Sequence, residues 1–231
     1  MKLNTCSYNI NMLELMLVNA LYYSWEPKYY KYMKAKENEK HDDETLKLLS
    51  IASFGSCALI LFSDWIGYVL GSESFHRSLY LIPLIVLGQF LLAINPIYKR
   101  HISFAKKTIY TSLIVLVAGA TNIWLNSIYI PKFGAAAGAY TTIFSYLIML
   151  LLTFFTAKHL IRLHVTPLGN IAKRVLVVVS VCSYYYLDLY YLDLNIFFQV
   201  LLKFGVLLLS GLLLLWNILL SGSGRNSSPK I

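Results

Sequence analysis

Long apolar runs, separated by short polar connections, limit the possible folds of this chain more than any other feature. A helix needs about 20 residues, each rising about 1.5 Å, to cross roughly 30 Å of hydrocarbon. Alternating segments of about ten residues, which a membrane β-barrel requires, do not occur. The pattern predicts an all-α, polytopic membrane helix bundle within residues 1–220. About seven segments meet or approach the spanning length, and they cover residues 8–26, 46–70, 77–98, 108–130, 134–157, 171–190 and 195–220.

Composition supports the same class of protein. Of the 231 residues, 58% are hydrophobic and only 13% are charged, and the mean hydropathy is +0.60. A water-soluble domain of this length needs more polar surface than such a chain supplies, so soluble enzymes are excluded. The last residues, 221–231, are rich in Gly and Ser, and they are predicted to form a disordered cytoplasmic tail.

The positive charge indicates membrane topology, because the basic residues occupy alternate connections and are not gathered on one predicted face. The formal net charge is +9, and we expect no nucleic-acid partner. The side with few basic residues carries Lys2, Arg77 and Lys132. This distribution predicts a cytoplasmic C-terminus and an outside N-terminus, and it leads us to expect that a further segment precedes residue 1. The opposite, cytoplasmic side carries Lys28, Lys31, Lys34, Lys36, Lys40, Lys47, Lys99, Arg100, Lys106, Lys107, Lys158, Arg162, Lys173, Arg174, Arg225 and Lys230.

The first apolar segment has one polar face. Asn11, Glu14 and Asn19 lie on it, together with Tyr8 and Tyr22, if the segment is helical. Such a face can pack against another helix. Alternatively, it can line a water-filled cavity in which Glu14 serves as a proton- or sodium-coupling site.

Three further charges occur in or near apolar segments. Lys203 is far enough inside the last segment that its ammonium group cannot easily reach the membrane surface. It is therefore expected either to pair with a carboxylate or to face an anionic lipid head group. Asp64 is predicted to lie near the outer interface. Asp188 stands among tyrosines typical of an interfacial aromatic belt, and we expect it in an outer connection.

Groupings typical of catalysis or metal binding are missing from the sequence. There is no strand followed by a glycine-rich phosphate loop, and no serine elbow. We therefore predict no catalytic residue, no cofactor and no metal site, and an integral-membrane sugar-processing enzyme is the disfavoured alternative. The five histidines fall in connections or at predicted helix ends without the spacing typical of zinc ligands, and they are His41, His76, His101, His159 and His164.

Residues 122–142, NIWLNSIYIPKFGAAAGAYTT, predict a tightly packed hairpin of two helices. Asn122 and Asn126 are four residues apart, so they share one helix face and can hydrogen-bond a neighbouring helix. Pro131 and Gly134 are predicted to close the turn. In the following helix, small residues at spacings of three and four allow another backbone to approach closely, and these residues are Gly134, Ala135, Gly138, Ala139 and Thr142.

This hairpin also carries a resemblance to a known family. Three stretches, LVNALYYSWEPKYY from Leu17, GSESFHRSLYLIPLIVLGQFLLAINPIYKR from Gly71, and the hairpin sequence, resemble the C-terminal half of bacterial polysaccharide exporters and O-antigen flippases. These proteins belong to the multidrug/oligosaccharidyl-lipid/polysaccharide exporter superfamily. The resemblance covers about residues 8–160, and the hairpin pattern is its most specific part.

The resemblance implies a transporter of the bacterial inner membrane. Family members have twelve or fourteen helices in two lobes, and they move lipid-linked oligosaccharides by alternating access. This chain would correspond to helices eight to fourteen, that is, to the C-terminal lobe and not to the first one. The implied substrate is an undecaprenyl-pyrophosphate-linked oligosaccharide. Asn11 and Glu14, on the same polar face as Asn19, would line the cavity, and Lys203 would contact an anionic head group or a tail groove.

Two functions follow from this resemblance. The chain can be a truncated or split half of an exporter, whose partner would be a separately encoded N-terminal half. Alternatively, it can be a non-transporting membrane interaction or accessory protein, either an inactive fragment or a half-unit that needs a partner. Neither reading involves covalent chemistry.

Overall fold

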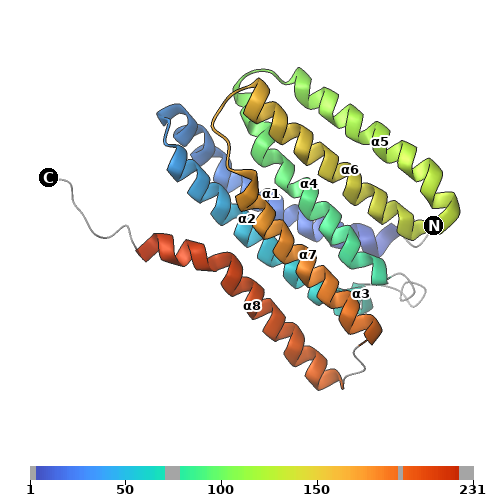
Figure 1. Ribbon diagram of the computed structural model, residues 1–231. Helices are drawn as coiled ribbons and strands as arrows, with labels where there is room; N and C mark the ends of the chain where they lie inside the picture. Colours follow the sequence, from blue (N-terminus) through green and yellow to red (C-terminus); the bar gives the residue numbers. More distant parts are fainter. Residues whose placement is uncertain (1–3, 71–78, 192–194, 224–231) are drawn as a thin grey trace.

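The computed structural model describes residues 4–70, 79–191 and 195–223, and within them every element is helical (Figure 1). Within these ranges, side chains are described except for those of residues 4–15 and 216–223 and of a few single residues. Since no strand occurs in the described ranges, the predicted all-helical class is confirmed. The elements are α1 (Asn4–Ala35), α2 (Asn38–Leu61), α3 (Ser63–Leu70), α4 (Ile82–Phe104), α5 (Ile109–Phe133), α6 (Ala135–Phe155), the π-helical turn η2 (Thr156–Leu160), α7 (Leu168–Tyr191) and α8 (Ile196–Ser223).

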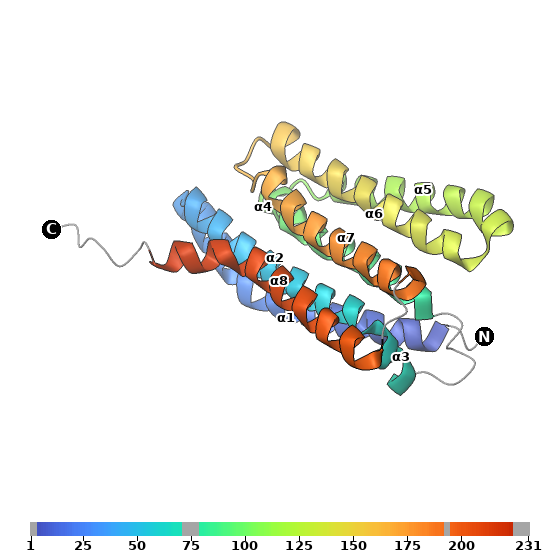
Figure 2. The same cartoon turned by 60° about the horizontal axis from the view of Figure 1, so that its bottom comes forward.

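The long helices lie side by side in three layers (Figure 1, Figure 2). The α5–α6 hairpin forms one outer layer, α4 and α7 the middle one, and α1, α2 and α8 the other outer layer. Helix α4 contacts α1, α2, α6 and α7, and it therefore supplies much of the core. Phe90, Ile94, Ile97 and Tyr98, which recur at helical spacing along α4, are fully buried.

Five helical stretches of the described chain are long and apolar enough to cross a membrane: Asn38–Leu61, Leu79–Phe104, Ile109–Phe133, Ala136–Leu160 and Ile196–Leu215. The expected number of about seven therefore remains a prediction for α1 and α7, which are long enough but carry more polar residues. Helix α5 buries only Ile114 and Ala118 and exposes large apolar side chains, as a helix that faces lipid does.

The predicted helix over residues 46–70 is divided in the structure, so this boundary prediction was wrong. Helix α2 begins earlier, at Asn38, and ends at Leu61, and α3 follows from Ser63. The break occurs at Phe62, whose φ of -103° and ψ of 15° depart from helical values. Hydropathy averaged over a spanning length merges the two helices, because apolar residues lie on both sides of the polar pair Ser63 and Asp64.

Other helix ends also differ from the apolar runs. Helix α4 continues to Phe104, six residues beyond the predicted end at 98, because hydropathy marks the apolar part of a helix and not its end. Pro131, expected in the turn, lies inside α5. The helix ends instead at Phe133 and is followed by Gly134, where φ is 73° and ψ is -162°. Helix α8 runs to Ser223, into the predicted tail, and residues 224–231 lie outside the described part.

Polar side chains join α5 to α6 within the hairpin. Asn126 Nδ2 donates to Asn122 Oδ1 at 2.9 Å, and Asn122 Nδ2 donates to Thr142 Oγ1 at 3.4 Å. The Thr141 hydroxyl also donates to Asn126 Oδ1. At Gly138 an added Cβ would lie 3.7 Å from the end of the Ile130 side chain, which is ordinary van der Waals contact. The hairpin is thus linked by hydrogen bonds, and Gly138 does not mark a tight backbone crossing.

Candidate functional site

The buried ammonium group of Lys203 connects three helices. Lys203 is on α8 and is 5% exposed. Its Nζ atom lies 3.1 Å from Asp64 Oδ2 on α3 and 3.6 Å from Asp188 Oδ2 on α7. We call Asp64, Asp188 and Lys203 the charge triad. It joins residues that are widely separated along the chain.

A tyrosine orients the charge triad. The Tyr185 hydroxyl donates a hydrogen bond to Asp64 Oδ1, and Lys203 Nζ lies 5.7 Å from the centre of the Tyr185 ring. Tyr185 and Asp188 are three residues apart on α7, so they share one face of that helix. Asp64 lies in the first turn of α3, where the helix dipole favours a negative charge.

The charges of the triad do not cancel. With all three groups ionised, one ammonium faces two carboxylates, and a net negative charge remains. The Asp188 side chain is 6% exposed, and its Oδ1 atom has no hydrogen-bond partner within the described part of the chain. Burying charges costs several kcal/mol for each ion, and a buried pair is therefore weak evidence for a purely stabilising role. Within a membrane, such groups mark substrate or ion pathways.

A groove of about 650 Å³ runs beside the charge triad. Its lining includes the Asp64 carboxylate, the Gln199 amide and the Lys203 ammonium, together with tyrosine and tryptophan side chains. This set of groups can accept hydrogen bonds from hydroxyl groups and can pack against the faces of sugar rings. The groove is lined by Asp64, Trp65, Tyr68, Leu79, Tyr80, Tyr185, Leu189, Ile196, Gln199 and Lys203.

A second, smaller groove of about 170 Å³ lies between α1, α4 and α6. Asn19, Gln89 and Asn95 supply amides to it, and Lys99 supplies a positive charge. Asn95 Nδ2 donates to Thr153 Oγ1 at 2.9 Å, which fixes that amide between α4 and α6. The Tyr22 hydroxyl donates to the Ala93 carbonyl and holds α1 against α4.

The predicted cavity residues do not form one site. Asn19 and Lys203 line different grooves, which share no lining residue. The side chains of Asn11 and Glu14 lie outside the described residues, although both positions are helical. Lys203 was expected to pair either with a carboxylate or with an anionic lipid head group. In the structure it pairs with the carboxylates of Asp64 and Asp188.

Sequence reasoning missed that Asp64 and Asp188 belong together. Both were interpreted as interfacial groups on their own. A signal was available, because the whole chain has only 11 Asp and Glu residues, and few of them lie in or beside apolar segments. A lysine inside an apolar helix needs one of those few carboxylates.

Comparisons with protein-family models, with curated proteins and with solved structures found no match for this chain. The resemblance to polysaccharide exporters therefore rests on the sequence stretches quoted above.

Proposed function

We propose that this chain is a partial exporter, a truncated or split half, that by itself moves a lipid-linked oligosaccharide across the bacterial inner membrane by alternating access. The sequence resemblance supports the substrate class, and the bundle of apolar helices supports a membrane location. The observation that supports transport most directly is the burial of Lys203 between two carboxylates beside a groove.

The two grooves suit different parts of such a substrate. Asp64 and Asp188 repel the pyrophosphate, so the larger groove fits uncharged sugars better than it fits the anionic group. Lys99 and the amides of the smaller groove provide a cation and hydrogen-bond donors for a phosphate oxygen. The polyprenyl tail stays in lipid, next to exposed apolar side chains such as those of α5.

In this proposal the ion pairs of the charge triad hold α8 against α3 and α7 in one conformation of the bundle. Its three residues come from α3, α7 and α8, so a displacement of α8 against the other two helices separates charges that otherwise neutralise one another in part. The inward-open and outward-open conformations of the bundle would differ in whether these ion pairs are formed. The substrate shifts the equilibrium between the two conformations because it binds one of them more tightly.

Reconstitution into vesicles tests the proposal. The purified chain is incorporated into vesicles that carry a fluorescent, polyprenyl-pyrophosphate-linked oligosaccharide, and a membrane-impermeant quencher reports the probe in the outer leaflet. We expect the protected inner-leaflet fraction to fall faster than in protein-free vesicles. A rate equal to that of protein-free vesicles would contradict transport by this chain.

A transfer rate equal to that of protein-free vesicles would favour the alternative function, a non-transporting membrane partner. Helices α5 and α8 expose many large apolar side chains, among them Leu116, Ile123 and Trp124 on α5 and Leu208 on α8. Such faces can be covered by another membrane protein as well as by lipid.

A further inference from the structure

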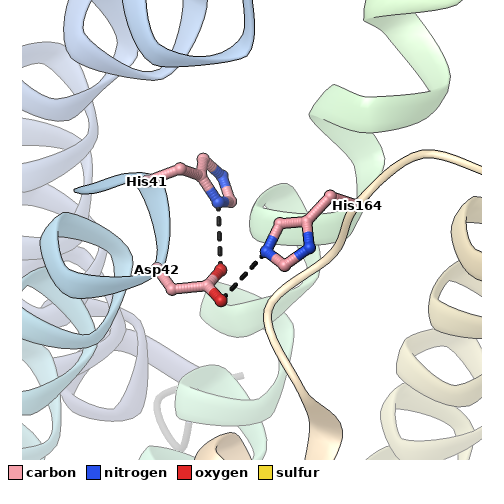
Figure 3. A group of neighbouring side chains, drawn as sticks. All are labelled: His41, Asp42 and His164. Atoms are coloured by element: carbon pink, nitrogen blue, oxygen red, sulfur yellow. Dashed lines mark hydrogen bonds and ion pairs between the residues drawn. The ribbon is translucent and has the colours of Figure 1, made fainter. Parts of the chain in front are cut away.

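At another end of the bundle, three potential metal ligands come together from two separate parts of the chain (Figure 3). His41 and Asp42 lie near the start of α2, and His164 lies in the connection between η2 and α7. One ligand atom from each residue can be chosen so that all three lie within 4.8 Å of one another. Sequence spacing gave no hint of this group, because 122 residues separate Asp42 from His164.

Both imidazole rings point a nitrogen atom at the same carboxylate (Figure 3). His41 Nδ1 lies 3.2 Å from Asp42 Oδ1, and His164 Nε2 lies 3.0 Å from Asp42 Oδ2. Zinc binds imidazole nitrogen and carboxylate oxygen at about 2.0–2.2 Å, which places the ligand atoms of a tetrahedron about 3.3 Å apart. Each nitrogen–oxygen separation is close to this value, but the two end on different oxygens of the carboxylate, so an ion held by one of these oxygens requires the carboxylate to turn between the two rings.

The surroundings hold the three ligands in place. The Thr166 hydroxyl donates to Asp42 Oδ1 at 2.8 Å, and the Thr166 carbonyl accepts a hydrogen bond from buried Tyr98 at 3.0 Å. These contacts fix the connection that carries His164. Neighbouring groups of this kind orient metal ligands in known sites.

The charge and solvent access also favour a cation. No ion pair within the described residues joins Asp42 to a lysine or an arginine, whereas the neighbouring Glu44 pairs with Lys28 and Lys47. The His41 side chain is 1% exposed, and its Nε2 atom has no hydrogen-bond partner among the described residues. The His164 side chain is 35% exposed, which gives an ion a path from solvent and leaves one coordination position for water.

We infer that His41, Asp42 and His164 bind a divalent transition-metal ion of the zinc type. The ligand set of two neutral imidazoles and one carboxylate suits Zn²⁺ in preference to Mg²⁺ or Ca²⁺, which favour sites made of oxygen atoms alone. The ion fastens the start of α2 to the connection before α7. This inference does not depend on the transport proposal, since it concerns ligand residues of neither groove.

Zinc binding to the full chain in detergent, after removal of metal by a chelator, tests this inference. We expect saturable binding of one Zn²⁺ per chain in competition with a chromophoric chelator, and Co²⁺ in its place should give the strong visible absorption of a tetrahedral site. Asp42→Asn and His164→Ala should each weaken the affinity by about 100-fold or more. Circular dichroism of both variants checks that they keep the helical content of the unchanged chain.

The matched control is His159→Ala, which removes an exposed histidine outside the group. This variant should bind Zn²⁺ like the unchanged chain. Absence of saturable binding would overturn the inference. Equal affinities for the unchanged chain and for His164→Ala would also overturn it, because the metal would then be bound elsewhere.

Discussion

At the scale of single residues, Lys203 carries the strongest physical constraint in the bundle. An unpaired lysine at the centre of a membrane helix costs about 2.5–3.5 kcal/mol on insertion scales. Asp64 and Asp188 offset this cost in the structure, and each of them in turn depends on the ammonium group. Sequence alone identified Lys203 as a residue that needs a partner, but it could not choose the partner, since that choice depends on how α3, α7 and α8 pack.

Removal of Lys203 should therefore destabilise the fold. We expect Lys203→Met to lower the free energy of unfolding by about 3 kcal/mol, because two carboxylates lose their cation, and one of them is almost fully buried. Denaturant unfolding in detergent micelles, followed by circular dichroism, measures this difference. The exposed Lys132 provides the matched control, and Lys132→Met should change stability by less than about 0.5 kcal/mol.

A compensating variant separates the loss of a charge from the loss of packing. If Lys203→Met is combined with Asp64→Asn and Asp188→Asn, no uncompensated charge remains, and most of the stability should return. A triple variant as unstable as Lys203→Met would show that the lysine acts through its packing alone.

At the scale of helices, the α5–α6 hairpin shows what sequence patterns can and cannot establish. The pair Asn122 and Asn126 led us to expect a polar helix face, and in the structure both amides make hydrogen bonds within the hairpin. The position of the turn was less predictable. Pro131 is accommodated inside α5, and Gly134 ends the helix because its backbone conformation is almost unique to glycine.

The two glycines of this hairpin should respond oppositely to replacement by alanine. Gly134→Ala should lower the free energy of unfolding by about 1–3 kcal/mol, because a Cβ atom is strained at a φ of 73°. Gly138→Ala should be neutral or stabilising by up to about 1 kcal/mol, since the position is helical and has room for a methyl group. Thermal unfolding of the two variants compares them directly. Equal losses of stability would contradict this assignment of roles.

At the scale of the whole molecule, hydropathy was sufficient to predict an all-helical fold with several helices long and apolar enough to cross a membrane. It could not predict the layers, because each apolar helix presents similar side chains to lipid and to protein. The same limit explains the missed groupings. The charge triad and the pair of histidines around Asp42 each combine residues from distant segments. Their proximity depends on how α3, α7 and α8 pack in the first case, and on how α2 packs against the connection before α7 in the second.

The two groupings have different roles in our proposals. The charge triad and its groove provide the feature that a transporter of lipid-linked sugars can use, and the proposed metal site fastens a different part of the bundle. If the charge triad controls movement of the substrate, as proposed, transport depends on the charge of Lys203 and not on the net charge of the protein.

The initial rate of oligosaccharide transfer between leaflets, compared for Lys203→Met and Lys132→Met in vesicles, tests this claim most directly. Each variant removes one positive charge, and the comparison is made at equal amounts of folded protein. We expect Lys203→Met to transfer the fluorescent lipid at least about tenfold more slowly, equivalent to about 1.4 kcal/mol in the barrier, whereas Lys132→Met should match the unchanged chain. Equal rates for the two variants would contradict a role of the charge triad in transport.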